Sequence, residues 1–397
     1  MNGRTRHLAL VALAVVALVA LPLVAQYAGN FWVRTLDVAL LYVLLALGLN
    51  IVVGYAGLLD LGYVAFYAVG AYTFGLMASP QLLDTFPGLK AMFPGGLHMP
   101  VWLAIFIGAG VAGIAGALLG APTLKLRGDY LAIVTLGFGE IIRVFMNNLD
   151  APVNITNGPK GISQIDSMRV FGFDIGRPHH WFGVELSSVT QYYFVLILLV
   201  AASIFVCYRL ERSRIGRAWM AIREDEIAAK AMGINTRNMK LLAFGMGATF
   251  GGISGIMFAT FQTFISPESF SLQESIMIVA MVVLGGIGHI PGVVLGALLL
   301  AALPEVLRWV SGEFDLQRIT GGRLDAAILR QLLIALAMIG IMLARPRGLW
   351  PSPEHGDAAP QPEVEPPPGD KPGVPQRVTP LTSTVTNPVH GSGARHV

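Results

Sequence analysis

Charged side chains are scarce in this chain of 397 residues. Asp, Glu, Lys and Arg together make up 13% of it, while hydrophobic residues make up 54%. A soluble domain usually carries about 25% charged residues, so the composition excludes an ordinary water-soluble domain. The formal net charge of +3 is too small to indicate a nucleic-acid partner.

Several chemical signatures are also missing. The single cysteine, Cys207, lies in an apolar run and excludes an intrachain disulfide. No lysine is followed by Ser or Thr, so the chain has no Walker A loop. The eight histidines form no HExxH pair and no Cys/His cluster has metal-site spacing, and no Gly-x-Ser-x-Gly elbow occurs. The sequence therefore predicts no catalytic centre, metal site or cofactor in this chain.

What the chain does have is a series of long apolar runs. A transmembrane helix needs about 20 apolar residues, and a bilayer admits helices because they satisfy their own backbone groups. The runs predict an all-α, polytopic bundle of about ten membrane helices, at roughly 8–26, 35–53, 58–78, 100–121, 129–148, 191–208, 241–264, 274–288, 291–310 and 326–344. The sequence GGIGHIPG interrupts the pair 274–288 and 291–310. Such a break is tolerated where protein or a cavity covers the freed backbone groups.

Basic residues set the expected orientation. With the amino terminus inside, the inside segments hold fourteen Lys and Arg residues before the tail, and the outside segments hold seven. Lys and Arg favour the cytoplasmic side, so both termini are predicted to be cytoplasmic, in a bacterial inner membrane. Residues 1–26 also have the basic start and apolar middle of a signal peptide. The length of the run and the lack of a clear cleavage site favour a retained helix.

Three regions follow from these patterns. Residues 1–350 form the predicted transmembrane domain, and residues 209–240 form a charged cytoplasmic loop within it. Residues 351–397 are polar and rich in proline, and such a composition cannot bury a core. We expect this tail to be disordered.

Small residues recur every four positions on two of the predicted helices. Gly108, Ala112, Gly116 and Gly120 form one series, and Gly247, Gly251 and Gly255 form another. This spacing places small residues on one helix face, where they let membrane helices approach closely. The pattern predicts helix packing and does not indicate a substrate.

Two pairs of opposite charges lie inside apolar runs. Glu140 and Arg143 are three residues apart, as are Glu305 and Arg308, so each pair can meet on a helix face. Charge at membrane depth is costly and marks a transport pathway or a packing contact near the interface. For Glu140 and Arg143 both interpretations stay open, whereas for Glu305 and Arg308 the packing interpretation is favoured.

The segment AWMAIREDEIAAKAMG, residues 218–233, concentrates charge between two apolar runs. At 100° per residue, one helix of about four turns would place Ala218, Ile222, Asp225, Ala229 and Met232 on one face. Glu226 and Lys230 would form an i,i+4 pair, and Gly233 would end the helix. The alternatives are a solvated connector, a helix lying on lipid, or a helix that docks a cytoplasmic partner. The lipid alternative lacks large apolar anchors apart from Trp219.

A family resemblance bears on this segment. IAAKAMG, residues 227–233, resembles the EAA-x-x-x-G loop of ABC-importer permeases at Ala228, Ala229 and Gly233, with Ile227 where the general pattern has Glu. Further stretches are similar to the LivM-type permease of branched-chain amino acid ABC importers (the LivH/LivM family), from about residue 35 to 350. These are GLLDLGYVAFYAVGAY (57–72), LKLRGDYLAIVTLGFGEIIR (124–143), NGPKGIS (157–163), GRAWMAIREDEIAAKAMGI (216–234), SPESF (266–270), VVLGGIG (282–288) and RPRGL (345–349).

The resemblance implies a permease subunit with several partners. These are a second homologous permease, two cytoplasmic ABC ATPase subunits that hold ATP and Mg, and a periplasmic amino-acid-binding protein. It also implies that 218–233 is the ATPase-coupling helix, with its candidate contacts at Trp219, Arg223, Glu224, Asp225, Glu226, Ala228, Ala229 and Gly233.

Two alternative functions remain at this point. The same family resemblance fits importers of urea, of another small amide or of an organic acid. A secondary transporter driven by an ion gradient would carry its substrate without an ATPase, but it leaves the 218–233 helix unexplained.

Overall fold

The structure is a computed structural model that describes most of the apolar part of the chain. The described residues are 18–27, 29–123, 126, 128–170, 173–181, 184–313 and 348–350, with 332, 335, 336, 339, 340 and 343. The start of the first predicted helix, most of the predicted run 326–344 and the whole tail 351–397 lie outside them. For those segments the sequence predictions stay predictions.

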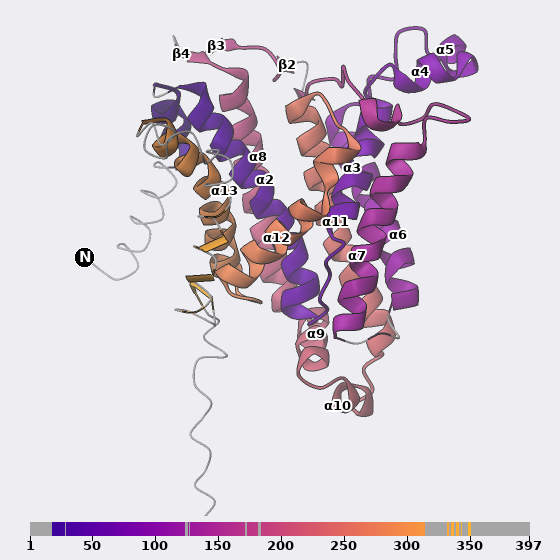
Figure 1. Cartoon of the computed structure of the whole chain (residues 1–397), viewed down its shortest axis with the longest axis vertical. Helices are drawn as coiled ribbons and strands as arrows, with labels where there is room; N and C mark the ends of the chain where they lie inside the picture. The colour runs from indigo at the N-terminus through magenta and orange to yellow at the C-terminus, as the bar shows by residue number, and fades with distance from the viewer. Residues whose placement is uncertain are drawn as a thin grey trace, which may run out of the picture. The chain divides into compact units, whose positions relative to one another are not determined.

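The described residues are mostly helical (Figure 1). The longer helices are α2 (Asn30–Asn50), α3 (Val64–Met77), α6 (Val101–Thr123), α7 (Asp129–Asn148), α8 (Ser188–Glu211), α11 (Thr236–Gln262), α12 (Leu272–Gly285) and α13 (Ile290–Glu313). A further apolar helix, Leu18–Tyr27, precedes α2. These helices coincide with the predicted runs to within a few residues at most ends, because each run is bounded by polar residues, Gly or Pro.

The count of about ten spans stays a prediction. Within the described ranges, five helical segments are long and apolar enough to cross a membrane: Asn30–Tyr55, Val101–Thr123, Ser188–Glu211, Thr236–Gln262 and Pro267–Gly285. Helix α7 matches the predicted run 129–148 but is amphipathic, and α3 and α13 offer shorter apolar lengths.

Short elements lie in the connections. The 79–99 loop contains α4 (Gln81–Thr85) and α5 (Pro87–Met92). The 149–190 loop contains a 3-10 turn η2 (Gly158–Lys160) and two antiparallel hairpins, β1–β2 (Arg169–Val170 with Phe173–Asp174) and β3–β4 (His179–Trp181 with Val184–Leu186). A second 3-10 turn, η3 (Pro267–Phe270), precedes α12. Figure 1 shows the hairpins at the opposite end of the bundle from two short helices, α9 (Arg214–Glu224) and α10 (Glu226–Ala231).

One predicted helix begins later than its apolar run indicates. The run 58–78 becomes α3 only from Val64, because Gly57 has φ +68° and residues 57–62 are not helical. The backbone freed there is paired: Thr135 Oγ1 accepts from Leu61 N, Asp60 Oδ1 accepts from Gly62 N, and Ser275 Oγ donates to Leu61 O. A non-helical segment among membrane helices needs such partners, since lipid supplies none.

Helix α2 is the centre of the bundle. It packs against α8, α11, α12 and α13, and nearly all its residues from Ala39 onward are buried. It ends in a π-helical turn, η1 (Ile51–Tyr55). A π-turn inside or at the end of an α-helix is often found at functional sites.

The two glycine series pack α11 against its neighbours on different sides. A Cβ on Gly108 or Gly116 of α6 would lie 2.4 Å from Ile256 Cδ1 or 2.5 Å from Ala248 Cβ on α11. A Cβ on Gly251 or Gly255 of α11 would instead meet α3, at 3.0 Å from Phe66 Cβ or 2.1 Å from Tyr67 O. The small residues therefore hold α11 between α6 and α3 at distances that any side chain would prevent.

We predict that Gly255→Leu disrupts this packing. The new side chain would collide with the backbone of α3 at Tyr67 O and Ala71 N, which cannot move aside. Overpacking of this kind costs about 1–3 kcal/mol of folding free energy. The measurement is the thermal midpoint of the detergent-solubilised protein by fluorescence-detected size exclusion. Gly110→Leu on α6 is the matched control, because a Cβ there has no neighbour within 4 Å. Equal midpoints for the two variants would contradict the packing assignment.

Candidate coupling surface and membrane cavity

The charged segment forms two helices instead of one. Helix α9 (Arg214–Glu224) and helix α10 (Glu226–Ala231) meet at Asp225, whose backbone is extended at φ −151° and ψ 110°. The Asp225 carboxylate accepts hydrogen bonds from Ile227 N at 2.7 Å and Ala228 N at 3.1 Å. Asp225 is therefore the N-cap of α10, a position that Asp favours strongly. The prediction of one four-turn helix was wrong because it treated Asp225 as a helix-interior residue.

The break changes which residues share a surface. Trp219 and Ala229 are buried, 0% and 4% exposed, while Ile227 and Met232 are 70% and 84% exposed. Ala229 and Met232 therefore do not lie on a common face, contrary to the helical-wheel prediction. Gly233 has φ +85° just after α10, the conformation expected of a residue that ends a helix. The free end of the loop thus presents two large apolar side chains to its surroundings.

Buried contacts anchor the loop to the first turns of α11. Trp219 Nε1 donates to Met239 O at 2.7 Å, and Lys240 Nζ lies 2.8 Å from Glu226 Oε1. The Lys240 side chain is only 6% exposed, so this ion pair is largely shielded from water. The helical wheel paired Glu226 with Lys230, whereas the structure brings its carboxylate to Lys240 on the next helix. Trp219 is consequently an internal anchor of the loop.

Arg223 connects the loop to the centre of the bundle. Its Nη1 donates to Gly54 O in η1 at 2.5 Å, and Gly57 leaves room for it, since a Cβ there would lie 2.8 Å from Arg223 Cγ. Burial lowers the pKa of the Arg223 guanidinium from its usual value, and the neighbouring Glu224 carboxylate opposes that shift. A guanidinium stays protonated in proteins, so Arg223 remains a charged donor to the end of α2.

The same region of α2 also contacts the α12–α13 turn. Asn50 Oδ1 accepts a hydrogen bond from Gly288 N at 2.9 Å. Arg223 thus joins α9 to the end of α2, and Asn50 joins the end of α2 to the turn between α12 and α13.

The remaining coupling candidates lie at the surface. Glu224, Asp225 and Ala228 are exposed, and Ala228 neighbours the protruding Ile227. These residues surround the apolar tip of the loop with polar groups and backbone.

The Glu140–Arg143 pair forms as its spacing predicts, with Arg143 Nε 3.1 Å from Glu140 Oε2. Arg143 also reaches Glu268 of η3, with Nη1 3.2 Å from Oε1. The three side chains join α7 to the segment before α12. They are not among the residues that line the cavity described next, and both interpretations of the Glu140–Arg143 pair stay predictions.

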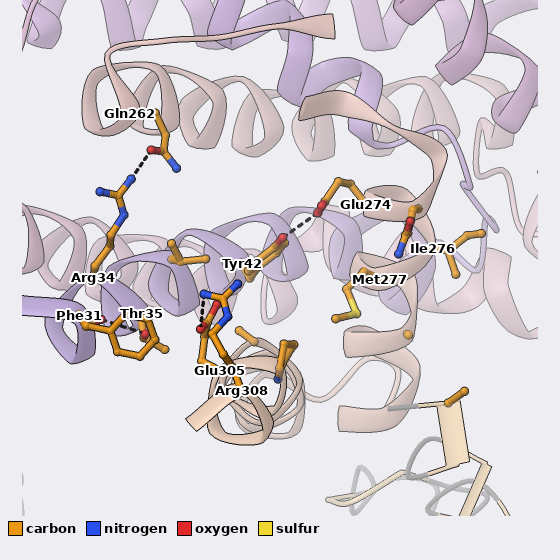
Figure 2. Close-up of a pocket in the computed structure, with 16 residues that line it drawn as sticks. Phe31, Arg34, Thr35, Tyr42, Gln262, Glu274, Ile276, Met277, Glu305 and Arg308 are labelled. Carbon is orange, nitrogen blue, oxygen red and sulfur yellow. Dashed lines mark hydrogen bonds and ion pairs between the residues drawn. The ribbon is translucent and has the colours of Figure 1, made fainter. Parts of the chain in front are cut away.

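A cavity of about 590 Å³ lies between α2, α12 and α13 (Figure 2). Its polar lining includes Arg34, Tyr42, Glu274, Glu305 and Arg308. Tyr42 Oη donates to Glu274 Oε2 at 2.7 Å, Arg34 Nη2 donates to Gln262 Oε1 at 2.5 Å, and Arg308 Nη1 lies 3.1 Å from Glu305 Oε2. The volume is within the range typical of small-molecule sites.

Sequence reasoning missed three of the charged groups in this region. Arg34 is one of the seven basic residues of the outside segments, Glu274 is the first residue of the predicted run 274–288, and Asp37 lies inside the run 35–53. Asp37 is fully buried on α2, and neither carboxylate oxygen has a hydrogen-bond partner among the described residues. The signal that could have found them is any ionisable residue inside an apolar run.

These features define a multi-pass membrane protein of the transport class, with an anchored loop at one end of the bundle and a polar cavity between its helices. Comparison with protein families then identifies the family of transport proteins to which the chain belongs. The model of the branched-chain amino acid transport system/permease component family matches residues 31–342, and the chain belongs to this family.

Similar proteins bear related names. The high-affinity branched-chain amino acid transport system permease protein LivM of Escherichia coli (strain K12) is 42% identical over 351 residues, which are 84% of this chain and 74% of that protein. The probable branched-chain amino acid transport permease protein LivM of Methanocaldococcus jannaschii is 26% identical, over 78% of this chain and 90% of that protein. LivH of Escherichia coli (strain K12) is 25% identical, over 65% of this chain and 79% of LivH. No solved structure matched the chain.

Proposed function

We propose that this chain is the membrane-spanning permease subunit of an ATP-driven importer for branched-chain amino acids. The names of the similar LivM and LivH proteins support this cargo and a second permease as partner. The observation that carries the mechanism is the α9–α10 loop, which is anchored inward by Trp219 and Arg223 and exposes an apolar tip.

The proposed assembly divides the work between chains. Two cytoplasmic ABC ATPase subunits bind ATP and Mg and dock on α9–α10, and a periplasmic binding protein delivers the amino acid at the hairpin end. This chain then lies in a bacterial inner membrane with both termini in the cytoplasm. The sequence contains no Walker A loop, which agrees with an energy source on another subunit.

We predict that the reconstituted complex imports leucine and does not import urea. The measurement is uptake of each labelled compound into proteoliposomes that contain both permeases and the ATPases, with the binding protein outside and ATP inside. Uptake of urea instead would indicate the alternative cargo. Leucine uptake that persists with a hydrolysis-deficient ATPase and follows an ion gradient would indicate a secondary transporter and contradict the proposal.

We predict that the double variant Ile227→Asp/Met232→Asp loses ATPase binding. Both side chains are exposed at the tip of α10, so the fold tolerates the change while a docking surface acquires two carboxylates. The amount of ATPase that co-purifies with the permease should fall at least about tenfold, the loss expected when buried apolar contacts of an interface are replaced. Met92→Asp is the matched control, because Met92 is 75% exposed on α5, far along the chain from the loop. Normal co-purification of the double variant would place the ATPase elsewhere.

We predict that Arg223→Ala separates docking from transport. The variant keeps the exposed tip, so the ATPases still co-purify, but it loses the bond to Gly54 O that connects α9 to α2. Leucine uptake should fall at least about tenfold at an unchanged amount of assembled complex. Arg214→Ala, an exposed arginine on the same helix, should retain uptake. Wild-type uptake by the Arg223 variant would show that the Arg223–Gly54 contact does not transmit the movement.

A further inference from the structure

The polar groups of the cavity lie at two depths. Arg34 is near the start of α2 and Tyr42 lies eight residues later, so the two are separated by roughly 12 Å along the helix. Tyr42 meets Glu274, and Figure 2 shows these two side chains converging from different helices. Glu274 is therefore about two helical turns deeper than Arg34.

A second arginine lies near the level of the first. Trp309 follows Arg308 on α13, and its ring packs edge-on against Trp32 at 6.4 Å between centroids. Trp32 is two residues before Arg34, so Arg308 belongs to the same outer level of the cavity. Arg308 is paired there with Glu305, so the arrangement leaves Arg34 as the positive group toward the hairpin end and the Glu274 carboxylate as the negative group farther in.

The Glu274 carboxylate has unused hydrogen-bonding capacity. The Tyr42 hydroxyl is its hydrogen-bond donor among the described residues, and a carboxylate can accept about four hydrogen bonds. Glu274 also lies in the first turn of α12, where the helix dipole favours a negative charge. Tyr42 and the helix end thus hold the carboxylate in place while leaving one side of it open to the cavity.

The surfaces around Glu274 are aliphatic. Val38 of α2, Met277 and Ala280 of α12 and Ala301 of α13 line the same cavity. An ammonium group offers three donors and a positive charge to a carboxylate, and aliphatic walls accept an aliphatic side chain. Met277 can adapt to side chains of different branching, since methionine is flexible.

We propose that Glu274, oriented by Tyr42, binds the ammonium group of an aliphatic amino acid as it crosses the membrane. The aliphatic walls receive its side chain, and Arg34 attracts its carboxylate at the outer level before it reaches Glu274. This site deepens the proposed function and rests on it for the cargo. A carboxylate open to a cavity at this depth is costly, and an arriving ammonium group offsets that cost.

The uptake test compares two substitutions of the same type in the reconstituted complex. Glu274→Gln keeps an acceptor for Tyr42 and removes the charge, so leucine uptake should fall at least about tenfold while the assembled amount stays unchanged. Glu274→Asp keeps the charge on a shorter side chain and should restore part of the uptake. Glu268→Gln should retain wild-type uptake, because the Glu268 carboxylate points to Arg143 and does not line the cavity.

A second measurement detects the charge without any transport. Cys207 is the only cysteine, so Cys207→Ser gives a cysteine-free chain into which Met277→Cys places one thiol beside Glu274. The ratio of the rate with a trimethylammonium methanethiosulfonate to the rate with the sulfonate analogue, divided by the same ratio at an exposed control thiol, should be roughly tenfold, and Glu274→Gln should bring it close to one. Met92→Cys on α5, 75% exposed and outside the cavity, provides the control thiol and should show no effect of Glu274→Gln. Mass spectrometry of this chain gives both rates.

The outcomes separate this site from the proposed function. If the wild-type complex fails to import leucine, the proposed cargo is wrong whatever the labelling shows. If the wild type imports leucine and Glu274→Gln imports it equally well, Glu274 does not bind the ammonium group. A normalised rate ratio close to one in the presence of Glu274 would also overturn the site, and would leave the Tyr42–Glu274 bond as a packing contact.

Discussion

The close approach of α11 to its neighbours is the contact on which the rest of the bundle depends. Glycines on α6 and α11 let backbones meet where a Cβ would collide, so α11 is held between α6 and α3 and also touches α2. In lipid, water does not drive helices together, and close van der Waals packing takes over that role. Because α11 is held firmly, its two ends provide fixed attachment points for the loop at one end and for Arg34 at the other.

The contacts at the loop end connect a small surface element to the membrane helices. Trp219 and Lys240 join the loop to α11, while Arg223 joins it to η1 at the end of α2. The loop is thus in contact with two helices at once, as the proposed coupling role requires. The π-helical turn at η1 is the local irregularity at which α2 receives this contact, and irregular turns of this type can shift without unfolding a helix.

Charge inside the membrane region follows a consistent physical rule. Glu140, Arg143 and Glu268 pair with one another away from the cavity, whereas Arg34, Glu274 and the Glu305–Arg308 pair line it. Exposed charge cannot face hydrocarbon, so the second group requires water, substrate or another protein chain beside it. This requirement agrees with a permease that works beside a second permease.

Sequence alone determined the helical class, most helix positions, the loop as the site of concentrated charge, and the membership of the family. These follow from local properties: apolar length, Gly spacing and the composition of short motifs are readable without knowing what packs where. The predicted run 58–78 shows where local properties are insufficient. Helix α3 begins only at Val64, because the non-helical backbone at Leu61 forms hydrogen bonds with Thr135 of α7 and Ser275 of α12. Only tertiary structure decided that Asp225 divides the loop into two helices, that Glu226 meets Lys240, and that Tyr42 and Glu274, 232 residues apart, share a hydrogen bond. Periodicity specifies which face of a helix a residue occupies, but the partner that covers that face comes from another part of the chain.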